Sequence, residues 1–191
     1  MKKVFFVLVL TSLTLASCTG TKQTRQTTED LQQDKVVELT FIFTRQNGHA
    51  TNQFAVWIED ANSQHVKTIY ATNFTANGGW RRRPDAIPNW VKQFDISNAT
   101  KVQIDSVSGA TKKTGTQNFI WDGTDSNGIT VPSGDYTLFF EGTLRWENQV
   151  IYRVPIKLGG GAAFAEVSVE YSGDFIAERS MIDNVMVQVF R

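Results

Sequence analysis

Six segments of this chain alternate apolar and polar residues with a period of two, and this pattern limits the fold more than any other feature. The segments are 37–44, 53–59, 136–145, 150–157, 165–171 and 185–189. Successive side chains of a strand point to opposite faces, so each segment predicts a half-buried strand. Turn signals between them predict an all-β, Ig-like antiparallel β-sandwich with Greek-key character. Residues 88–94, opened by Pro88, favour a helix of one or two turns, so at most one short helix is expected.

The first seventeen residues have the pattern of a lipoprotein signal peptide. Lys2 and Lys3 precede an apolar stretch, residues 4–15, that is too short for a stable membrane span. Residues 15–18 (LASC) resemble a lipobox, in which Cys18 becomes the diacylated residue; ordinary secretory cleavage is the alternative. Cys18 is also the only cysteine, which excludes a disulfide within one chain. We therefore expect a cell-envelope protein that faces the periplasm and is held to a bilayer through Cys18, in a membrane that the sequence leaves undetermined.

The rest of the chain divides in two by composition. Residues 18–34 are polar and nearly free of apolar side chains, which predicts a flexible lipidated tether. Residues 35–191 are long enough for one β-sandwich domain with its own core. Removal of residues 1–17 leaves 17 basic and 19 acidic side chains, a net charge of −2. This balance gives no electrostatic footprint for nucleic acid.

Residues 105–111 (DSVSGAT) contain the most informative motif. They resemble the sequence to which bacterial flavin transferases attach FMN through a threonine hydroxyl, here that of Thr111. A hydroxyl can be esterified by a phosphate, and the small residues Gly109 and Ala110 leave the backbone open to a second enzyme. Asp105 and Ser108 are expected to hydrogen-bond the backbone of the same loop in Asx- and ST-turns. The alternative is a surface turn of small residues that is never modified.

Residues 121–138 form the clearest structural passage. Asn127 and Gly128 both tolerate positive φ, which predicts a tight hairpin turn. The WDG…DxxG…VxSGxY pattern resembles the Ig-like repeat of flagellar hook-capping proteins. The spacing of Asp122, Asp125 and Asp135 does not match an EF-hand, so a turn is favoured over a calcium loop.

Together with this passage, residues 55–61 (AVWIEDA), Trp80, Trp90 and the DSVSGAT motif resemble a secreted bacterial family, domain-of-unknown-function family 2271. The resemblance covers Val36 to about Val154 and gives no expectation after Lys157. It implies a flavin-acceptor loop inside an Ig-like domain. It also implies two kinds of partner, an FMN transferase and membrane electron-transfer components.

Other candidate sites are weaker. His49 and His65 are expected to be solvated loop residues, and two scattered histidines support neither a metal site nor a Ser-His-Asp triad. Glu59 and Asp60 favour a strand-end turn over paired acid–base catalysis. No convergent set of acid, base and nucleophile supports a hydrolase.

Residues 78–83 (GGWRRR) allow two interpretations. Trp80 beside three arginines can stack on an isoalloxazine ring or bind its phosphate, but a mobile, solvated loop is favoured. Trp57, Trp90 and Trp121 are expected in the core.

The leading hypothesis is an extracytoplasmic lipoprotein that carries covalent FMN on Thr111 and transfers electrons. Such a protein is a redox carrier and the substrate of a transferase, and not itself an enzyme. The alternative is a cofactor-free Ig-like lipoprotein that acts as a binding or assembly module.

Overall fold

The structure, a computed structural model, describes residues 36–174 and 177–190. The predicted signal peptide, Cys18 and the predicted tether lie outside the described residues, so they stay predictions.

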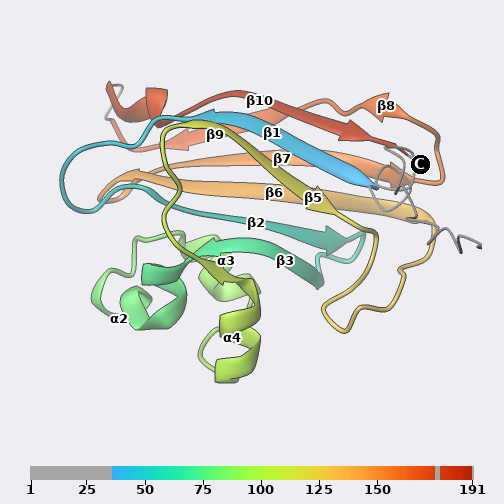
Figure 1. The fold of residues 1–191 in the computed structure, drawn as a ribbon, viewed down its shortest axis with the longest axis horizontal. Coiled ribbons are helices and arrows are strands. Elements are labelled where there is room, and N and C mark those ends of the chain that lie inside the picture. The colour runs from blue at the N-terminus through green and yellow to red at the C-terminus, as the bar shows by residue number, and fades with distance from the viewer. Residues whose placement is uncertain (1–35, 175–176, 191) are drawn as a thin grey trace, which may run out of the picture.

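Two β-sheets pack face to face (Figure 1). The four-stranded sheet has the order β5 (Gly115–Trp121), β1 (Val37–Phe43), β10 (Ile182–Val189) and β8 (Ala163–Phe164). The six-stranded sheet has the order β4 (Ser108–Gly109), β3 (His65–Thr72), β2 (Gln53–Asp60), β6 (Gly134–Arg145), β7 (Asn148–Leu158) and β9 (Ser168–Ser172). Among these neighbours only β3 and β4 run parallel. The predicted all-β sandwich is confirmed.

The main core fills the space between the sheets with the apolar members of the alternating segments. Leu39 and Phe41 of β1 are fully buried, as are Phe54 of β2 and Phe140 of β6. The rings of Phe41 and Phe140 lie 4.4 Å apart, centroid to centroid, so the two sheets interlock through aromatic contacts.

Short helical segments cover the outer face of the six-stranded sheet and make a third layer (Figure 1). They are η1 (Thr75–Gly79), α2 (Trp80–Arg82), α3 (Pro88–Gln93) and α4 (Lys101–Val107); η2 (Ala177–Met181) precedes β10. The expectation of at most one short helix is therefore wrong, although residues 88–94 do form one. Each segment is too short to show a helical period in the sequence.

The helical layer explains why β2 is buried on both faces. Phe54, Val56 and Ile58 face the other sheet, whereas Ala55 and Trp57 face the helices, where Trp90 of α3 is fully buried. Trp121 is also buried, so all three core assignments for tryptophan are confirmed.

The strand predictions differ from the structure in two places. The predicted strand 165–171 is wrong in extent, because residues 165–167 form no strand and β9 begins at Ser168. The strands β3, β4, β5 and β8 were not predicted, since their residues mix polar and apolar side chains without strict alternation. Within the described part of the chain, no helix is long and apolar enough to cross a membrane.

Candidate functional site: the acceptor segment

The predicted acceptor segment crosses from one sheet to the other. It leaves α4, adds β4 to the edge of the six-stranded sheet, and then rises to β5 of the four-stranded sheet (Figure 1). Thr111 lies in the crossing, between the end of β4 at Gly109 and the start of β5 at Gly115.

Asp105 and Ser106 belong to a helix and not to a loop. The Thr100 side chain and that of Gln103 form a reciprocal capping box, which starts α4. Asp105 then pairs with Lys101 one turn earlier, at 2.7 Å. The Asx-turn expected at Asp105 is therefore wrong, because its carboxylate is on the exposed face of α4.

Ser108 begins β4 and pairs with Ala71 of β3. Its hydroxyl is 3.4 Å from Nδ2 of Asn77, which donates to it from the helical layer. The expected ST-turn is likewise wrong: Ser108 fastens β4 to η1 and bonds no backbone group of its own loop among the hydrogen bonds of the described residues.

Gly109 is required by packing against Tyr70. A Cβ at position 109 would lie 2.6 Å from a ring carbon of Tyr70, too close for any side chain. The Tyr70 hydroxyl donates to the carbonyl oxygen of Ala110 at 2.7 Å. Burial raises the pKa of Tyr70 to about 12, so the hydroxyl keeps its proton and remains a donor. Tyr70 thus clamps the backbone just before Thr111.

The chain beyond Thr111 is fixed as firmly. Nζ of Lys112 lies 4.8 Å from the ring centroid of Tyr70 and 5.3 Å from that of Phe119, so it covers the edge of the core. The Thr114 hydroxyl accepts from the backbone N–H of Arg45 at 3.0 Å. Between these anchors Thr111 is half-buried, and no hydrogen bond to its hydroxyl occurs in residues 36–174 and 177–190.

The arrangement suits esterification of this hydroxyl by an anionic phosphate. The oxygen of Thr111 would not have to give up a bond of the fold, and Lys112 and Lys113 follow it directly. Two adjacent cations favour the negative charge of a phosphodiester. Ala110, just before it, is exposed, so the segment is open to a second protein. The residues present therefore fit the group that the motif implies.

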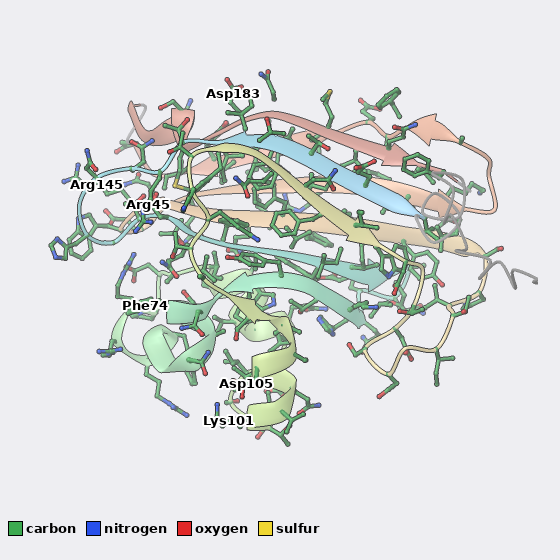
Figure 2. All side chains as sticks on the ribbon, viewed as in Figure 1. Arg45, Phe74, Lys101, Asp105, Arg145 and Asp183 are labelled. Carbon is green, nitrogen blue, oxygen red and sulfur yellow. The ribbon has the colours of Figure 1, made fainter. Side chains whose placement is uncertain are left out.

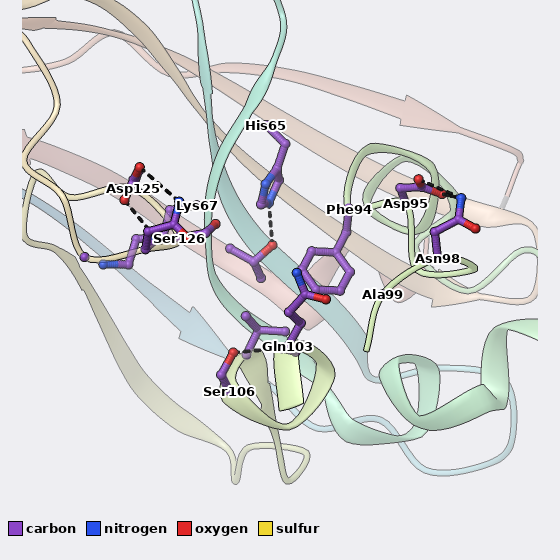
Figure 3. Close-up of a pocket in the computed structure, with 14 residues that line it drawn as sticks. His65, Lys67, Phe94, Asp95, Asn98, Ala99, Gln103, Ser106, Asp125 and Ser126 are labelled. Atoms are coloured by element: carbon purple, nitrogen blue, oxygen red, sulfur yellow. Dashed lines mark hydrogen bonds between the residues drawn. The ribbon is translucent and has the colours of Figure 1, made fainter. Parts of the chain in front are cut away.

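A groove of about 450 Å³ lies beside the motif but not at Thr111 (Figure 3). Ser106 and Val107 of α4 line one side, and His65 and Phe94 line another. His65 donates to or accepts from the Thr68 hydroxyl at 2.8 Å, and burial lowers its pKa to about 4. His65 is thus a neutral residue of β3, which corrects the expectation of a solvated loop histidine.

Sequence reasoning missed Glu141, a fully buried carboxylate on β6. Its oxygens accept from the backbone N–H of Trp90 at 2.9 Å and from the side chain of Asn89 at 2.6 Å. Burial raises the pKa of Glu141, and these donors act against that rise. The contact docks α3 on the sheet. The alternation of β6 had predicted a solvated residue here, and no local signal reveals a donor 52 positions away.

Glu59 and Asp60 end β2 in a turn, as expected. Glu59 accepts from the indole N–H of Trp57 at 2.7 Å, and burial raises the pKa of its carboxyl. Asp60 accepts from the backbone N–H groups of Asn62 and Gln64, each at 2.9 Å.

Residues 78–83 form the end of η1 and α2, so their interpretation as a mobile, solvated loop is wrong. Trp80 packs on the helical-layer core, and the Arg81 guanidinium lies 4.6 Å from the centroid of its ring. Arg83 is half-buried between Phe74 and Trp146, and burial lowers its pKa. Whether Trp80 contacts a flavin stays a hypothesis.

The turn predicted at residues 127–128 is present, but its backbone conformation differs from the predicted one. Gly128 has φ 78°, whereas Asn127 is not among the residues with positive φ. Asp125 organises the turn, since its carboxylate accepts from the backbone N–H groups of Asn127 and Ile129. Among the described His, Cys, Asp and Glu side chains, no group of three is placed to hold a metal ion.

Comparison with known proteins identifies the family. Residues 34–174 match the family described as "Predicted periplasmic protein (DUF2271)". The match extends the resemblance about 20 residues beyond Val154. No curated protein and no solved structure matches the chain. The description supports an extracytoplasmic location. Because the match covers most of its length, the chain belongs to this DUF2271 family of predicted periplasmic proteins.

Proposed function

We propose that the protein is a lipid-anchored electron carrier of the cell envelope, with FMN bound covalently to Thr111. The observation that carries the proposal is the contrast between Thr111 and its neighbours. Tyr70 fixes the backbone before it, and Lys112 and Thr114 fix the chain after it. The Thr111 hydroxyl itself makes no hydrogen bond within the described residues.

The attachment step is a phosphoryl-type transfer from FAD. The Thr111 oxygen attacks the phosphorus on the riboflavin side of the pyrophosphate and loses its proton to a base of the transferase. The bond between that phosphorus and the bridging oxygen breaks, and AMP leaves. The chain contributes the hydroxyl and its position, while the transferase contributes the metal ion and the base.

Bound FMN would supply reversible uptake of electrons and protons. The chain would hold it at one end of a rigid sandwich, with Lys112 and Lys113 beside its phosphate. Covalent attachment outside the cytoplasm prevents loss of the cofactor by diffusion. The donor and acceptor are expected among membrane electron-transfer components.

The test is flavin attachment to the chain co-expressed with an FMN transferase. We expect a fluorescent band after denaturing electrophoresis. Thr111→Val should abolish it, because the hydroxyl is removed while shape is kept. Thr111→Ser should restore at least part of it.

Thr114→Val is the matched control. It removes a hydroxyl three residues away that already accepts from Arg45, so flavin attachment should persist. Fluorescence retained in Thr111→Val would place the flavin elsewhere. A chain without flavin at adequate transferase levels would refute the carrier and favour a cofactor-free binding module.

A further inference from the structure

Positive side chains gather at the end of the sandwich that holds Thr111. Arg45 follows β1, and its backbone N–H bonds Thr114. Arg81 and Arg82 follow η1, which Asn77 ties to Ser108 of β4. Figure 2 shows Arg45, Phe74 and Arg145 at this same end, and the Arg82 guanidinium lies 5.5 Å from the Phe74 ring centroid.

We call Arg45, Arg81, Arg82, Lys112 and Lys113 the basic end. All but Lys112 are exposed. No carboxylate of the described residues forms an ion pair with any of these five side chains. Instead, Arg81, Arg82 and Lys112 lie over aromatic rings. Because no carboxylate neutralises these cations, they give the surface a positive electrostatic potential toward the solvent.

Two aspartates lie toward the opposite end, where the chain enters the domain. β1 runs from Val37 to Phe43, a span of about 20 Å at the usual rise of a strand. The end of β2, at Asp60, and the start of β6, at Asp135, lie at the Val37 end (Figure 1), and Asp135 pairs there with Lys157. Basic and acidic side chains are equal in number over the whole sequence, 19 of each, so the basic end does not reflect an excess of basic residues. Exposed Glu147, next to Trp146, and exposed Asp183, opposite Ile42, also lie toward this end.

An exposed tryptophan adjoins the basic end. Trp146 is at the tip of the β6–β7 hairpin, is 49% exposed and has φ 50°. Its backbone N–H donates to Ala50 of the β1–β2 connection, and its ring lies 6.0 Å from the Arg83 guanidinium. Tryptophan and arginine are the residues most enriched at the energetic centres of protein interfaces.

We propose that the basic end is the docking surface for a redox protein whose own contact face is acidic. This inference rests on the proposed function. Electrons pass between proteins only when their cofactors come close, so the surface around Thr111 must be the contact surface. Because that surface is cationic, an anionic partner face is attracted and oriented, and a cationic one is repelled.

The first experiment needs no flavin. The mature chain with Cys18→Ser is titrated with a dodecaglutamate peptide at low and high salt, and backbone amide shifts are recorded. Shifts are expected at the basic end and not near Asp60. Arg81→Gln/Arg82→Gln should weaken binding about fivefold. The charge-matched Lys92→Gln/Lys157→Gln should leave it unchanged.

The second experiment uses the flavinylated chain. The anionic hydroquinone of the flavin gives two electrons and releases one proton to the solvent, and two ferricyanide ions each accept one electron. Oxidation by this anion should slow as salt rises, and should be about fivefold slower in Arg81→Gln/Arg82→Gln at low salt. Oxidation by tris(phenanthroline)cobalt(III), a cation, should change in the opposite direction.

The outcomes separate the two proposals. Peptide binding mapped to the basic end, in a chain that never acquires flavin, would refute the carrier but keep the anion-binding surface. Equal effects of the two double variants would overturn the docking surface and leave the flavin unaffected. Vesicles of phosphatidylglycerol that bind the basic end more tightly than the peptide does would overturn the protein partner and assign the surface to a bilayer.

Discussion

Gly109→Ala tests whether the clamp by Tyr70 positions Thr111, the proposed acceptor. The new Cβ would lie 2.6 Å from a Tyr70 ring carbon. An ordinary contact between carbon atoms is about 3.5–4.0 Å, so the ring or β4 must move by about 1 Å. Tyr70 has little freedom, since its ring centroid lies 4.9 Å from that of Phe54 and 5.1 Å from that of Phe119.

Overpacking of this kind costs about 1–3 kcal/mol. For a chain of this size that corresponds to a fall in Tm of about 3–10 °C. Displacement of β4 also separates the Tyr70 hydroxyl from the Ala110 carbonyl. Flavin attachment should therefore slow even well below the Tm, where Gly109→Ala remains folded.

The assay is thermal unfolding together with the initial rate of flavin attachment at a fixed transferase concentration. Gly160→Ala is the control, because Gly160 is exposed and its added Cβ, 3.3 Å from the Lys157 carbonyl oxygen, requires a shift of only a few tenths of an ångström. A Gly109→Ala chain with the wild-type Tm and attachment rate would show that neither Tyr70 nor β4 restrains the segment.

Two further predictions concern residues outside the acceptor segment. Glu141→Gln turns an amide N–H₂ toward donors such as Asn89, so the free energy of unfolding should fall by about 2 kcal/mol. The control is Glu170→Gln, at an exposed residue paired with Arg153, which should change the free energy of unfolding by less than about 1 kcal/mol. Equal denaturation midpoints of the two variants would contradict this prediction. The pKa of His65 in the folded chain, about 4, is below the ordinary histidine value of 6.5, so the unfolded chain binds the proton more tightly. Stability from this group is therefore full above pH 6.5 and is lost, by at most about 3 kcal/mol, as pH falls through 4. His65→Gln should flatten that part of the pH profile of urea unfolding, and exposed His49→Gln should not; an unchanged profile in both would remove His65 as the cause.

The alternation of apolar and polar residues predicted the strands that have one face in the core and the other in solvent. β1 follows the rule fully, with Leu39 and Phe41 in the core and Ile42 on the outside. It fails for β6, where Glu141 and Thr143 occupy the face expected to be solvated and are completely buried. The helical layer that covers this face comes from elsewhere in the chain. A pattern local to one strand carries no information about such a cover.

The motif predicts Thr111 as the acceptor residue, which stays a prediction, but the local geometry of the motif was predicted wrongly. Asp105 and Ser108 were assigned to one loop, whereas α4 ends between them at Val107. A usable signal was present, because Thr100 and Gln103 have the spacing of a capping box and mark the start of a helix. No such signal exists for Tyr70, whose contact with Gly109 joins residues 39 positions apart.

Helix, strand and crossing therefore have separate parts in presenting Thr111. α4 sets the direction of the chain, β4 and Tyr70 fix its backbone, and Lys112 seals the core behind it. None of these contacts uses the threonine hydroxyl. A large group esterified to this hydroxyl would therefore break no hydrogen bond of the fold. A carrier requires this, because its fold must be stable in both redox states of the cofactor. If flavin attachment lowered the Tm by several degrees, the hydroxyl would have a structural partner after all, and the argument for Thr111 as an acceptor would lose its physical basis.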